Sequence, residues 1–489
     1  MIRDLLKDLA RYVPSQVVPA LVGLISIPLL TNLFPPEVYG DYRLVLATIV
    51  LFGTATGWLP SSIVRFYPAQ DAAGTLGSFY ANLIRFWLFS TGVFSAIWSL
   101  GLLGARSVFS DRLYELYWIG LAVLIVNSVF GVLAALIRSR RQISWFSFMT
   151  MWRSLMGLGF GMFLILVLGL GTEGFLWGMT ISGAVVIPML WRRTSHDVSP
   201  DFASGFDRHL ASGMARYAFP LMLGSFAGWL LKLSDRFVIE FFTSSTDLGI
   251  YSAAYGLAEQ SIGVIVQLFH LPFVVMGNRI WERDGQEAAA IFVRQVTRFF
   301  MMVAVPAVVG ISVLSKPVVT VMTGPEYLPG YRAIPWVAAG MLAFGFSQWY
   351  LAAFMFTKRM VFHTIGIVVG GLVNVALNLV LIPRFGYEAA AVTSFVGFLV
   401  VLVVIVPRSR RLFDWGFPVR SLVRITLASA VMGLFVILFR NLTELSAASY
   451  LILGVPLGIA VVTSMLIALG EFSPRELAAV RQIRHRDGK

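Results

Sequence analysis

Three charged side chains stand within one helical turn inside a long apolar stretch of the sequence. They are Lys232, Asp235 and Arg236, and a helix places them on the same face as Ser225 and Trp229. A charge near the centre of a bilayer costs about 2.5–3.5 kcal/mol even on lenient insertion scales, so this face must point into protein or water. The stripe could bind an anion or a coupling ion. It could equally be a self-neutralised ion-pair cluster that only joins two helices.

Four further charged residues lie in or beside other apolar stretches. Arg153 and Arg85 lie near the predicted cytoplasmic ends of their helices, where a long side chain can reach the interface. Arg65 ends a stretch, and it could anchor that end or contact a phosphate that enters from the cytoplasm. Glu259 lies near the middle of its stretch, where a carboxylate could bind a proton or a sodium ion, or could pair with Lys232.

Two asparagines, Asn374 and Asn378, are one turn apart in a further apolar stretch, and hydrogen bonding between helices is the favoured interpretation for both. The sequence has no cysteine, and its five histidines are far apart along the chain, so we expect no metal centre. It also has no P-loop. We therefore expect a protein that is not an enzyme, does not use ATP itself and needs no cofactor beyond a coupling ion, either H⁺ or Na⁺.

The composition places these polar residues in a membrane protein. Hydrophobic residues make up 58% of the 489 residues, charged residues make up 13%, and the mean hydropathy is +0.80. Soluble domains carry about 25% charged residues, so there is too little charge here to cover soluble cores. The net charge of +13 is scattered in short clusters between apolar runs, which is typical of topology determinants and not of a nucleic-acid surface. The sequence predicts an all-α integral membrane protein with membrane lipids, and no nucleic acid, as partners.

About fourteen stretches are long enough to cross the bilayer, for which about 20 apolar residues are needed. They lie near residues 12–33, 43–64, 79–103, 114–137, 145–170, 174–191, 217–241, 249–274, 297–322, 333–356, 361–382, 387–406, 420–439 and 449–470. With both termini in the cytoplasm, 27 of the 38 basic residues fall on inward segments and seven on outward ones. This bias predicts a multi-pass protein of the inner or plasma membrane with both termini cytoplasmic.

The two halves of the chain begin alike. ARYVP is followed by VYGDYRLVLA, and later ARYAFP is followed by LGIYSAAYGLA, so that Gly40 and Tyr42 align with Gly249 and Tyr251. An even repeat of about six spans predicts parallel halves, and in transporters the substrate path runs between such halves. We predict an N-terminal six-helix bundle at 1–194, a cytoplasmic linker at 195–216, a second six-helix bundle at 217–408, two additional helices at 409–470 and a cytoplasmic amphipathic tail at 471–489.

Four segments carry a resemblance to a known family: LLTNLFPPEVYGDYRLVLA, GWLPSSIVRFYP, KLSDRFVIEFFTSSTDLGIYSAAYGLAE and GGLVNVALNLVLIPRFGYEAAAVTS. With the number of spans, they make the chain resemble the O-antigen type of polysaccharide-export flippase in the multidrug/oligosaccharidyl-lipid/polysaccharide superfamily. The resemblance implies two six-helix bundles in a V shape around a central cavity, with two extra C-terminal helices. It also implies ion-coupled flipping of an undecaprenyl-diphosphate-linked oligosaccharide from the inner to the outer leaflet by alternating access.

The cavity of this family tends to be cationic, because fixed Arg and Lys side chains replace the water that a diphosphate-sugar head group sheds. The expected cavity cations are Lys232, Arg236, Arg153, Arg65 and Arg85. The expected ion-coupling residues are Asp235 and Glu259.

Three alternatives stay open. A drug/cation antiporter of the same superfamily has twelve spans and typically a more acidic cavity, so the last two spans and the basic stripe argue against it. A membrane-embedded glycan polymerase or ligase should carry a large outward loop, whereas the outward loops here are short. A non-transporting member of a glycan-assembly complex is compatible with the sequence, and glycan-assembly proteins are candidate partners.

Overall fold

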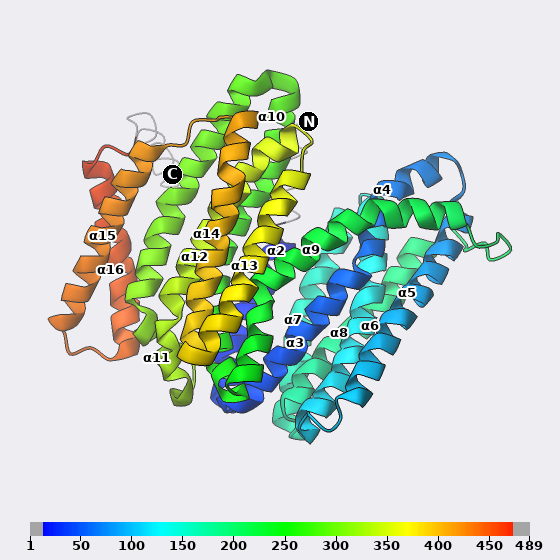
Figure 1. Cartoon of the computed structure of the whole chain (residues 1–489), viewed down its shortest axis with the longest axis horizontal. Coiled ribbons are helices and arrows are strands. Elements are labelled where there is room, and N and C mark those ends of the chain that lie inside the picture. Colours follow the sequence, from blue (N-terminus) through cyan, green and yellow to red (C-terminus); the bar gives the residue numbers. More distant parts are fainter. Residues whose placement is uncertain (1–12, 473–489) are drawn as a thin grey trace, which may run out of the picture. The chain divides into compact units, whose positions relative to one another are not determined.

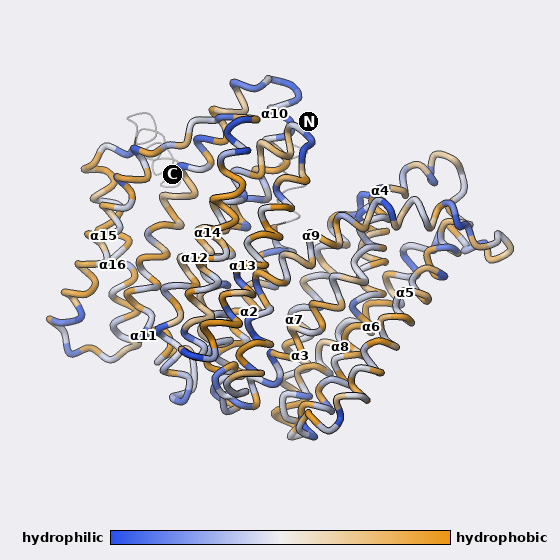
Figure 2. Tube along the Cα trace, in the orientation of Figure 1, coloured by the Kyte–Doolittle hydropathy of each residue, from blue (hydrophilic) through white to orange (hydrophobic). Residues whose placement is uncertain are grey.

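The computed structural model describes residues 13–472, and this part of the chain is helical with no strand (Figure 1). The first eight helices are α2 (Pro14–Leu33), α3 (Pro36–Thr56), α4 (Trp58–Ala72), α5 (Leu76–Gly104), α6 (Asp111–Ser139), α7 (Ile143–Leu168), α8 (Thr172–Ser195) and α9 (Arg208–Phe242). They are followed by α10 (Ser245–Val313), α11 (Ser315–Met322), the 3-10 helix η1 (Pro325–Arg332), α12 (Ile334–Phe356), α13 (Val361–Phe385), α14 (Tyr387–Leu412), α15 (Val419–Asn441) and α16 (Ala447–Ala468). Hydrophilic residues gather mostly at the turns between helices (Figure 2).

Twelve helices in the described part of the chain are long and apolar enough to cross a membrane. One of these, α10, is two helices that meet at Gly285, whose φ of 84° lies outside the helical region and suits glycine. The charged α9 is not among the twelve, but its 35 residues exceed the length that a span needs. Counting α10 twice and adding α9 gives the fourteen predicted spans, so the prediction of an all-α membrane protein is confirmed.

Two segments of the predicted cytoplasmic side, near 192–216 and 275–296, contain parts of long helices in the structure. α9 begins at Arg208, so the end of the first segment is the start of α9 itself. In the second segment both parts of α10 continue until they meet at Gly285. The predicted amphipathic tail lies beyond residue 472, outside the residues that the structure describes.

Contacts between helices divide the chain into two units. The first unit is Met1–Ser252 with Ile367–Ala390, and the second is Ala253–Gly366 with Ala391–Lys489. Three helices, α10, α13 and α14, therefore pass from one unit into the other. The predicted division of the chain into bundles at 1–194 and 217–408 rests on the sequence repeat, whereas the two units rest on contacts between helices. The predicted division stays a prediction.

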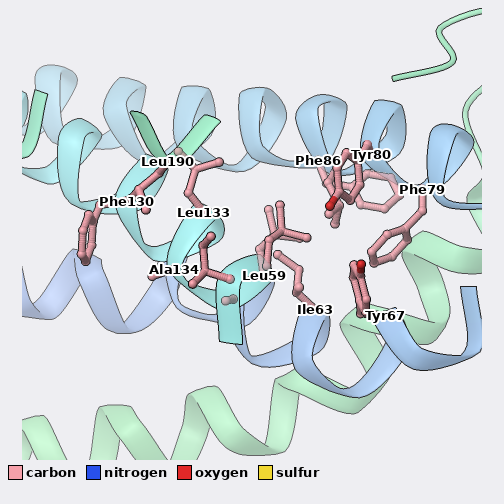
Figure 3. Packing of buried hydrophobic residues seen from close by; sticks show 14 of the residues in the cluster. Leu59, Ile63, Tyr67, Phe79, Tyr80, Phe86, Phe130, Leu133, Ala134 and Leu190 are labelled. Carbon is pink, nitrogen blue, oxygen red and sulfur yellow. The ribbon is translucent and has the colours of Figure 1, made fainter. Parts of the chain in front are cut away.

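A buried apolar cluster in the first unit joins α4 and α5 to α6, α8 and the start of α9. Figure 3 shows Tyr67 of α4 beside Phe79 of α5, and their ring centroids are 6.5 Å apart. The hydroxyl of Ser62 donates a hydrogen bond of 3.0 Å to the carbonyl of Met214. Helices in lipid associate through such packing and hydrogen bonding, because lipid is as apolar as the side chains. The cluster therefore fixes the first part of α9 on α4.

The glycines that the sequence repeat aligns meet in the first unit. A Cβ atom on Gly40 would overlap the backbone oxygen of Ser245, and a Cβ atom on Gly249 would overlap the backbone oxygen of Pro36. The shift that takes Gly40 to Gly249 also takes Pro36 to Ser245, so the contact is reciprocal. Small residues allow helix backbones to approach this closely. Reciprocal contacts are the mark of a two-fold relation between the contacting segments.

In the second unit the last two helices are bound to α10 and to each other. The hydroxyl of Tyr450 on α16 donates a hydrogen bond of 2.6 Å to the carbonyl of Val436 on α15. Just after α16, the buried carboxylate of Glu471 accepts a hydrogen bond of 2.7 Å from Nε of Arg298 on α10. Its other oxygen lies 3.6 Å from Nη1 of Arg424 on α15. One carboxylate thus joins three helices.

Candidate functional site

The charged stripe of α9 is a buried cluster in the first unit. Asp235 and Arg236 are each 1% exposed, and Nη1 of Arg236 lies 3.0 Å from Oδ1 of Asp235. The hydroxyl of Tyr251, on α10, donates to Oδ2 of Asp235. Nη1 of Arg236 also donates to the backbone oxygen of Lys232 at 2.7 Å. Both oxygens of the carboxylate are therefore engaged, and the arginine is paired with it.

The surroundings hold this cluster in place. The indole of Trp229 donates a hydrogen bond of 3.0 Å to the carbonyl of Ala47, which fixes α9 to α3. The guanidinium of Arg236 lies 6.0 Å from the ring centroid of Tyr251. Because Arg236 and Asp235 neutralise each other, the pair attracts an anion less than an unpaired arginine would. Lys232 is half-buried on the same helix and adds the positive charge of the stripe.

The two predicted interface asparagines lie on α13 in the same unit. Asn374 and Asn378 are fully buried, and Nδ2 of Asn378 donates a hydrogen bond of 3.1 Å to Oδ1 of Asn374. One turn earlier, a Cβ atom on Gly371 would lie 3.2 Å from the carbonyl of Ala227, so α13 packs on the backbone of α9 there. Nδ2 of Asn374 is buried and has no hydrogen-bond partner among the described residues. Buried amides and the Asp235 cluster thus stand on two helices that touch.

Arg153 lines a cavity of about 430 Å³ between α2, α3, α7 and α8 of the first unit. One of its Nη atoms donates to Oδ1 of Asn127, and its guanidinium lies 4.6 Å from the ring centroid of Phe130. The polar residues of the cavity wall are Ser26, Tyr42, Arg43, Thr150, Arg153, Ser154 and Ser182. Among the described residues no carboxylate is in the wall, so the part of the wall that they form is positively charged.

Arg43 is a second cation of this wall, and it is not among the residues that the sequence predicts for the cavity. It lies at the predicted outward end of its span, where a basic residue is expected to anchor the helix at the interface. In the structure it is half-buried, and its Nε is buried without a hydrogen-bond partner among the residues described. The signal available in the sequence is its place in the resemblance segment next to Tyr42, which lines the same cavity.

A second cavity of about 420 Å³ lies between α3, α4, α6 and α9. Thr54, Ser61, Asn127 and Ser225 supply its polar groups. Asn127 therefore lines this cavity while its side-chain oxygen holds Arg153, which lines the first one. One amide connects the walls of the two cavities.

Arg85 lines neither of these two cavities. Its guanidinium holds the segment between α8 and α9. Its Nη1 donates to the backbone oxygens of Ser204 and Gly205 at 2.8 and 2.9 Å. Its Nη2 donates to the backbone oxygen of Phe202 at 2.9 Å. Nearby, Oδ1 of Asn82 accepts a hydrogen bond of 3.0 Å from the amide of Asp207, which caps α9. In this arrangement Arg85 positions the linker.

The remaining predicted residues are not brought to either cavity. Arg65 is exposed on α4 and belongs to neither cavity wall. Glu259 is half-buried on the part of α10 that belongs to the second unit, whereas Lys232 belongs to the first. Pairing between them stays a prediction. In residues 13–472 no group of three or more His, Asp or Glu side chains is arranged to hold a metal ion.

The fold is shared with solved transporter structures. A lipid II flippase, MurJ, in an inward closed conformation superposes with a TM-score of 0.77 over 94% of this chain and 98% of that one, at 14% identity. An inward-facing multidrug resistance transporter of the MATE family, in the MOP superfamily, gives 0.66 over 82% of this chain and 97% of that one, also at 14% identity. The fold thus defines a multi-pass membrane protein of the MurJ and MATE type.

Sequence comparison gives the family. The succinoglycan biosynthesis transport protein ExoT of Rhizobium meliloti is 23% identical over 324 residues, which are 65% of this chain and 61% of that protein. The uncharacterized membrane protein MJ1068 of Methanocaldococcus jannaschii is 21% identical over 212 residues, which are 42% of this chain and 41% of that protein. The chain therefore spans less than two thirds of the length of each. Residues 29–331 match the polysaccharide biosynthesis protein family, and the chain belongs to this family.

Proposed function

We propose that the protein flips an undecaprenyl-diphosphate-linked oligosaccharide, or a similar glycolipid, from the cytoplasmic to the outer leaflet. The observation that carries the proposal is Arg153 on a membrane-spanning helix, in the wall of a cavity to which residues 13–472 contribute no carboxylate. Such a cavity offers an anionic head group a replacement for its lost water. Membership of a polysaccharide biosynthesis family and the MurJ-type fold support the same function.

Ion coupling by H⁺ or Na⁺ is part of the proposal. Asp235 is the first candidate, because it is a buried carboxylate on α9, which packs at Gly371 on α13, the helix that carries the buried Asn374 and Asn378. Glu259 is the second candidate. Movement of the glycolipid in proteoliposomes should respond to a Na⁺ or a proton gradient and should lose that response in Asp235→Asn. If the glycolipid moves at the same rate with the gradients present and with both gradients collapsed, ion coupling is contradicted.

The experiment that tests the function is deletion of the gene, followed by identification of the lipid-linked glycan that accumulates. The expected result is a glycolipid trapped on the cytoplasmic face, and its normal exposure on the outer face in the deletion strain would overturn the proposal. Cytoplasmic termini, an inner or plasma membrane location and contact with glycan-assembly proteins belong to the same proposal.

A drug/cation antiporter is the second candidate, because MATE transporters share the fold. Against it stands the cavity chemistry, since an arginine-lined wall without a carboxylate repels cationic drugs. Resistance of cells to cationic dyes that depends on the gene would favour this alternative over the flippase.

A further inference from the structure

An apolar cavity of about 270 Å³ lies between α5, α6 and α8 of the first unit. The middle helix of the three, α6, contacts both of the others (Figure 1). Tyr80, Leu83 and Trp87 of α5 form one side of the cavity, and Trp191 of α8 forms another. No residue of its wall lines either of the two polar cavities. This third cavity is therefore separate from the site on which the proposed function rests.

One face of α6 supplies the rest of the wall. Its residues run from Val129 to Leu136, which is about 10 Å along the helix axis at 1.5 Å per residue. Arg140 follows Leu136 by one turn, so it continues the same face beyond the end of the cavity. Trp191 is 37% exposed, so the cavity reaches the surface of the unit. An apolar slot thus ends beneath an arginine.

The hydroxyl of Tyr80 lies at the same end of the cavity, one turn from the start of α5. Tyr80 is 2% exposed, and its hydroxyl is buried without a hydrogen-bond partner among the described residues. The charge of the nearby Arg140 acts on this hydroxyl. A buried hydroxyl that lacks a partner is costly, and a ligand that brings an acceptor removes the cost. The packing of the three helices leaves this donor for a ligand.

The same end of the unit is strongly positive. The exposed Asp197 lies 3.9 Å from Nη1 of Arg140, and this is the single ion pair that the local arginines form within residues 13–472. An ion pair that exposed contributes little. The membrane topology accounts for basic residues on this side, but it does not require an apolar cavity next to them. The arginines that gather here are Arg138, Arg140, Arg141, Arg192 and Arg193.

Two hydrogen bonds fix the guanidinium of Arg140 at the end of the cavity. Its Nε donates to the hydroxyl of Tyr67 at 3.2 Å, and its Nη1 donates to the backbone oxygen of Arg193 at 3.3 Å. The second bond joins the end of α6 to the end of α8. Arg140 is therefore held in place before any ligand arrives, which lowers the entropy cost of binding.

We propose that this cavity binds one acyl chain of an anionic phospholipid of the predicted cytoplasmic leaflet, with the phosphate against Arg140 and the Tyr80 hydroxyl. Basic pockets between membrane helices on the cytoplasmic side suit anionic head groups, and the apolar wall suits the chain. The occupant is a lipid of the surrounding membrane and not the carried glycolipid, because the cavity shares no wall with the polar cavities. The inference does not depend on the proposed function.

The first test uses the unaltered full-length protein in phosphatidylcholine nanodiscs that contain a little phosphatidylglycerol with a diazirine on one acyl chain. Mass spectrometry maps the photo-adducts. We expect adducts on Leu83, Val132 and Leu136, and about tenfold fewer when phosphatidylcholine carries the same diazirine chain. Equal labelling by the two lipids, or no labelling of the cavity wall by phosphatidylglycerol, would overturn the proposal.

The second test compares variants in the same nanodiscs. Arg140→Gln should reduce labelling by phosphatidylglycerol about fivefold, whereas Arg384→Gln, which changes an exposed arginine at the end of α13, should not. Val132→Phe fills the cavity and should abolish labelling of Leu83 and Leu136. Its control is Val93→Phe on α5, at an exposed position outside the cavity wall. Labelling that is the same in each variant as in its control contradicts the site.

A last measurement separates the phospholipid from the carried lipid. Excess undecaprenyl diphosphate should leave the phosphatidylglycerol adducts unchanged. Loss of those adducts would assign the cavity to the carried lipid and overturn the proposal. If the wild-type protein flips no glycolipid but keeps the selective adducts, the proposed function fails and the phospholipid site stands.

Discussion

A buried ion pair responds differently to the loss of one partner and to the loss of both. Asp235 and Arg236 are each 1% exposed and are 3.0 Å apart, so removal of one leaves the other charged in a place that water does not reach. Tyr251 adds a hydrogen bond to the carboxylate. The pair and Tyr251 therefore hold α9 on α10, and variants of one and of both charged residues can measure this contribution to stability.

Arg236→Ala or Asp235→Ala should each lower the free energy of unfolding by about 3–5 kcal/mol, because each removes one side of a buried ion pair. The double variant should lose less than the sum of the two single losses. Unfolding in detergent, followed by tryptophan fluorescence, measures all three variants. Strictly additive losses would show that the two side chains do not act as a pair.

Lys232→Ala and Arg236→Ala should each abolish translocation while the protein still inserts in the membrane, because each removes a cation from the charged stripe. Surface glycan at matched protein levels is the measurement, and Lys232→Arg, which keeps the charge, is the control. Normal surface glycan in both alanine variants would contradict the prediction.

The charged stripe could be predicted from sequence because a charge inside an apolar run is conspicuous. Tyr251 could not be predicted as the partner of Asp235, since the contact depends on how two helices pack. Arg43 escapes notice because a basic residue near a helix end is normally read as an interfacial anchor. Arg85 is recognisable as a charge in a span, but its three carbonyl acceptors lie far along the chain and carry no local signal.

Among the described glycines, Gly40 and Gly249 make the closest approach to the backbone of another helix, in the reciprocal glycine contact. Gly40→Ala should lower the free energy of unfolding by about 1–3 kcal/mol, because its Cβ would overlap backbone that cannot turn aside as a side chain can. Gly53→Ala in the same helix is the control, since its Cβ would meet nothing within 4 Å. Thermal unfolding measures the Tm of both variants. Equal Tm values for Gly40→Ala and Gly53→Ala would contradict the prediction.

The linker between α8 and α9 depends on one side chain. Arg85→Ala should free the segment at residues 202–205 from α5, because three backbone oxygens lose their donors. Limited chymotrypsin digestion should then cut at Phe202 several-fold faster, whereas Arg192→Ala, which changes an exposed arginine at the end of α8, should not alter the rate. An unchanged rate in Arg85→Ala would show that other contacts hold the linker.

Span positions follow from sequence because the bilayer requires a long apolar run wherever a helix crosses it. The start of α9 at Arg208 does not follow, since that first turn is polar and gains its place by packing on α4. The continuation of α10 to Gly285 could not be predicted from the sequence either, because a helix outside the membrane can have as polar a sequence as a loop.

For the molecule as a whole, the distribution of basic residues predicts orientation. The C-terminus should lie in the cytoplasm, because most arginines and lysines fall on the segments placed there. A reporter that works only in the cytoplasm should therefore be active when it is fused to the C-terminus. Paired alkaline phosphatase and green fluorescent protein fusions measure this. Activity of the phosphatase fusion alone would mean that the orientation is reversed or that the number of crossings is odd.

The contact of Gly40 with Ser245 and of Gly249 with Pro36 has the form that a symmetric dimer makes with a second copy of itself. A half-length chain holding one such glycine could have assembled in this way before the two copies were joined. After such a joining each copy is free to change alone, and the matching places now hold Pro36 and Ser245. The backbone contact persists through it because it depends on the absence of a side chain at the two glycines and not on which residue supplies the carbonyl.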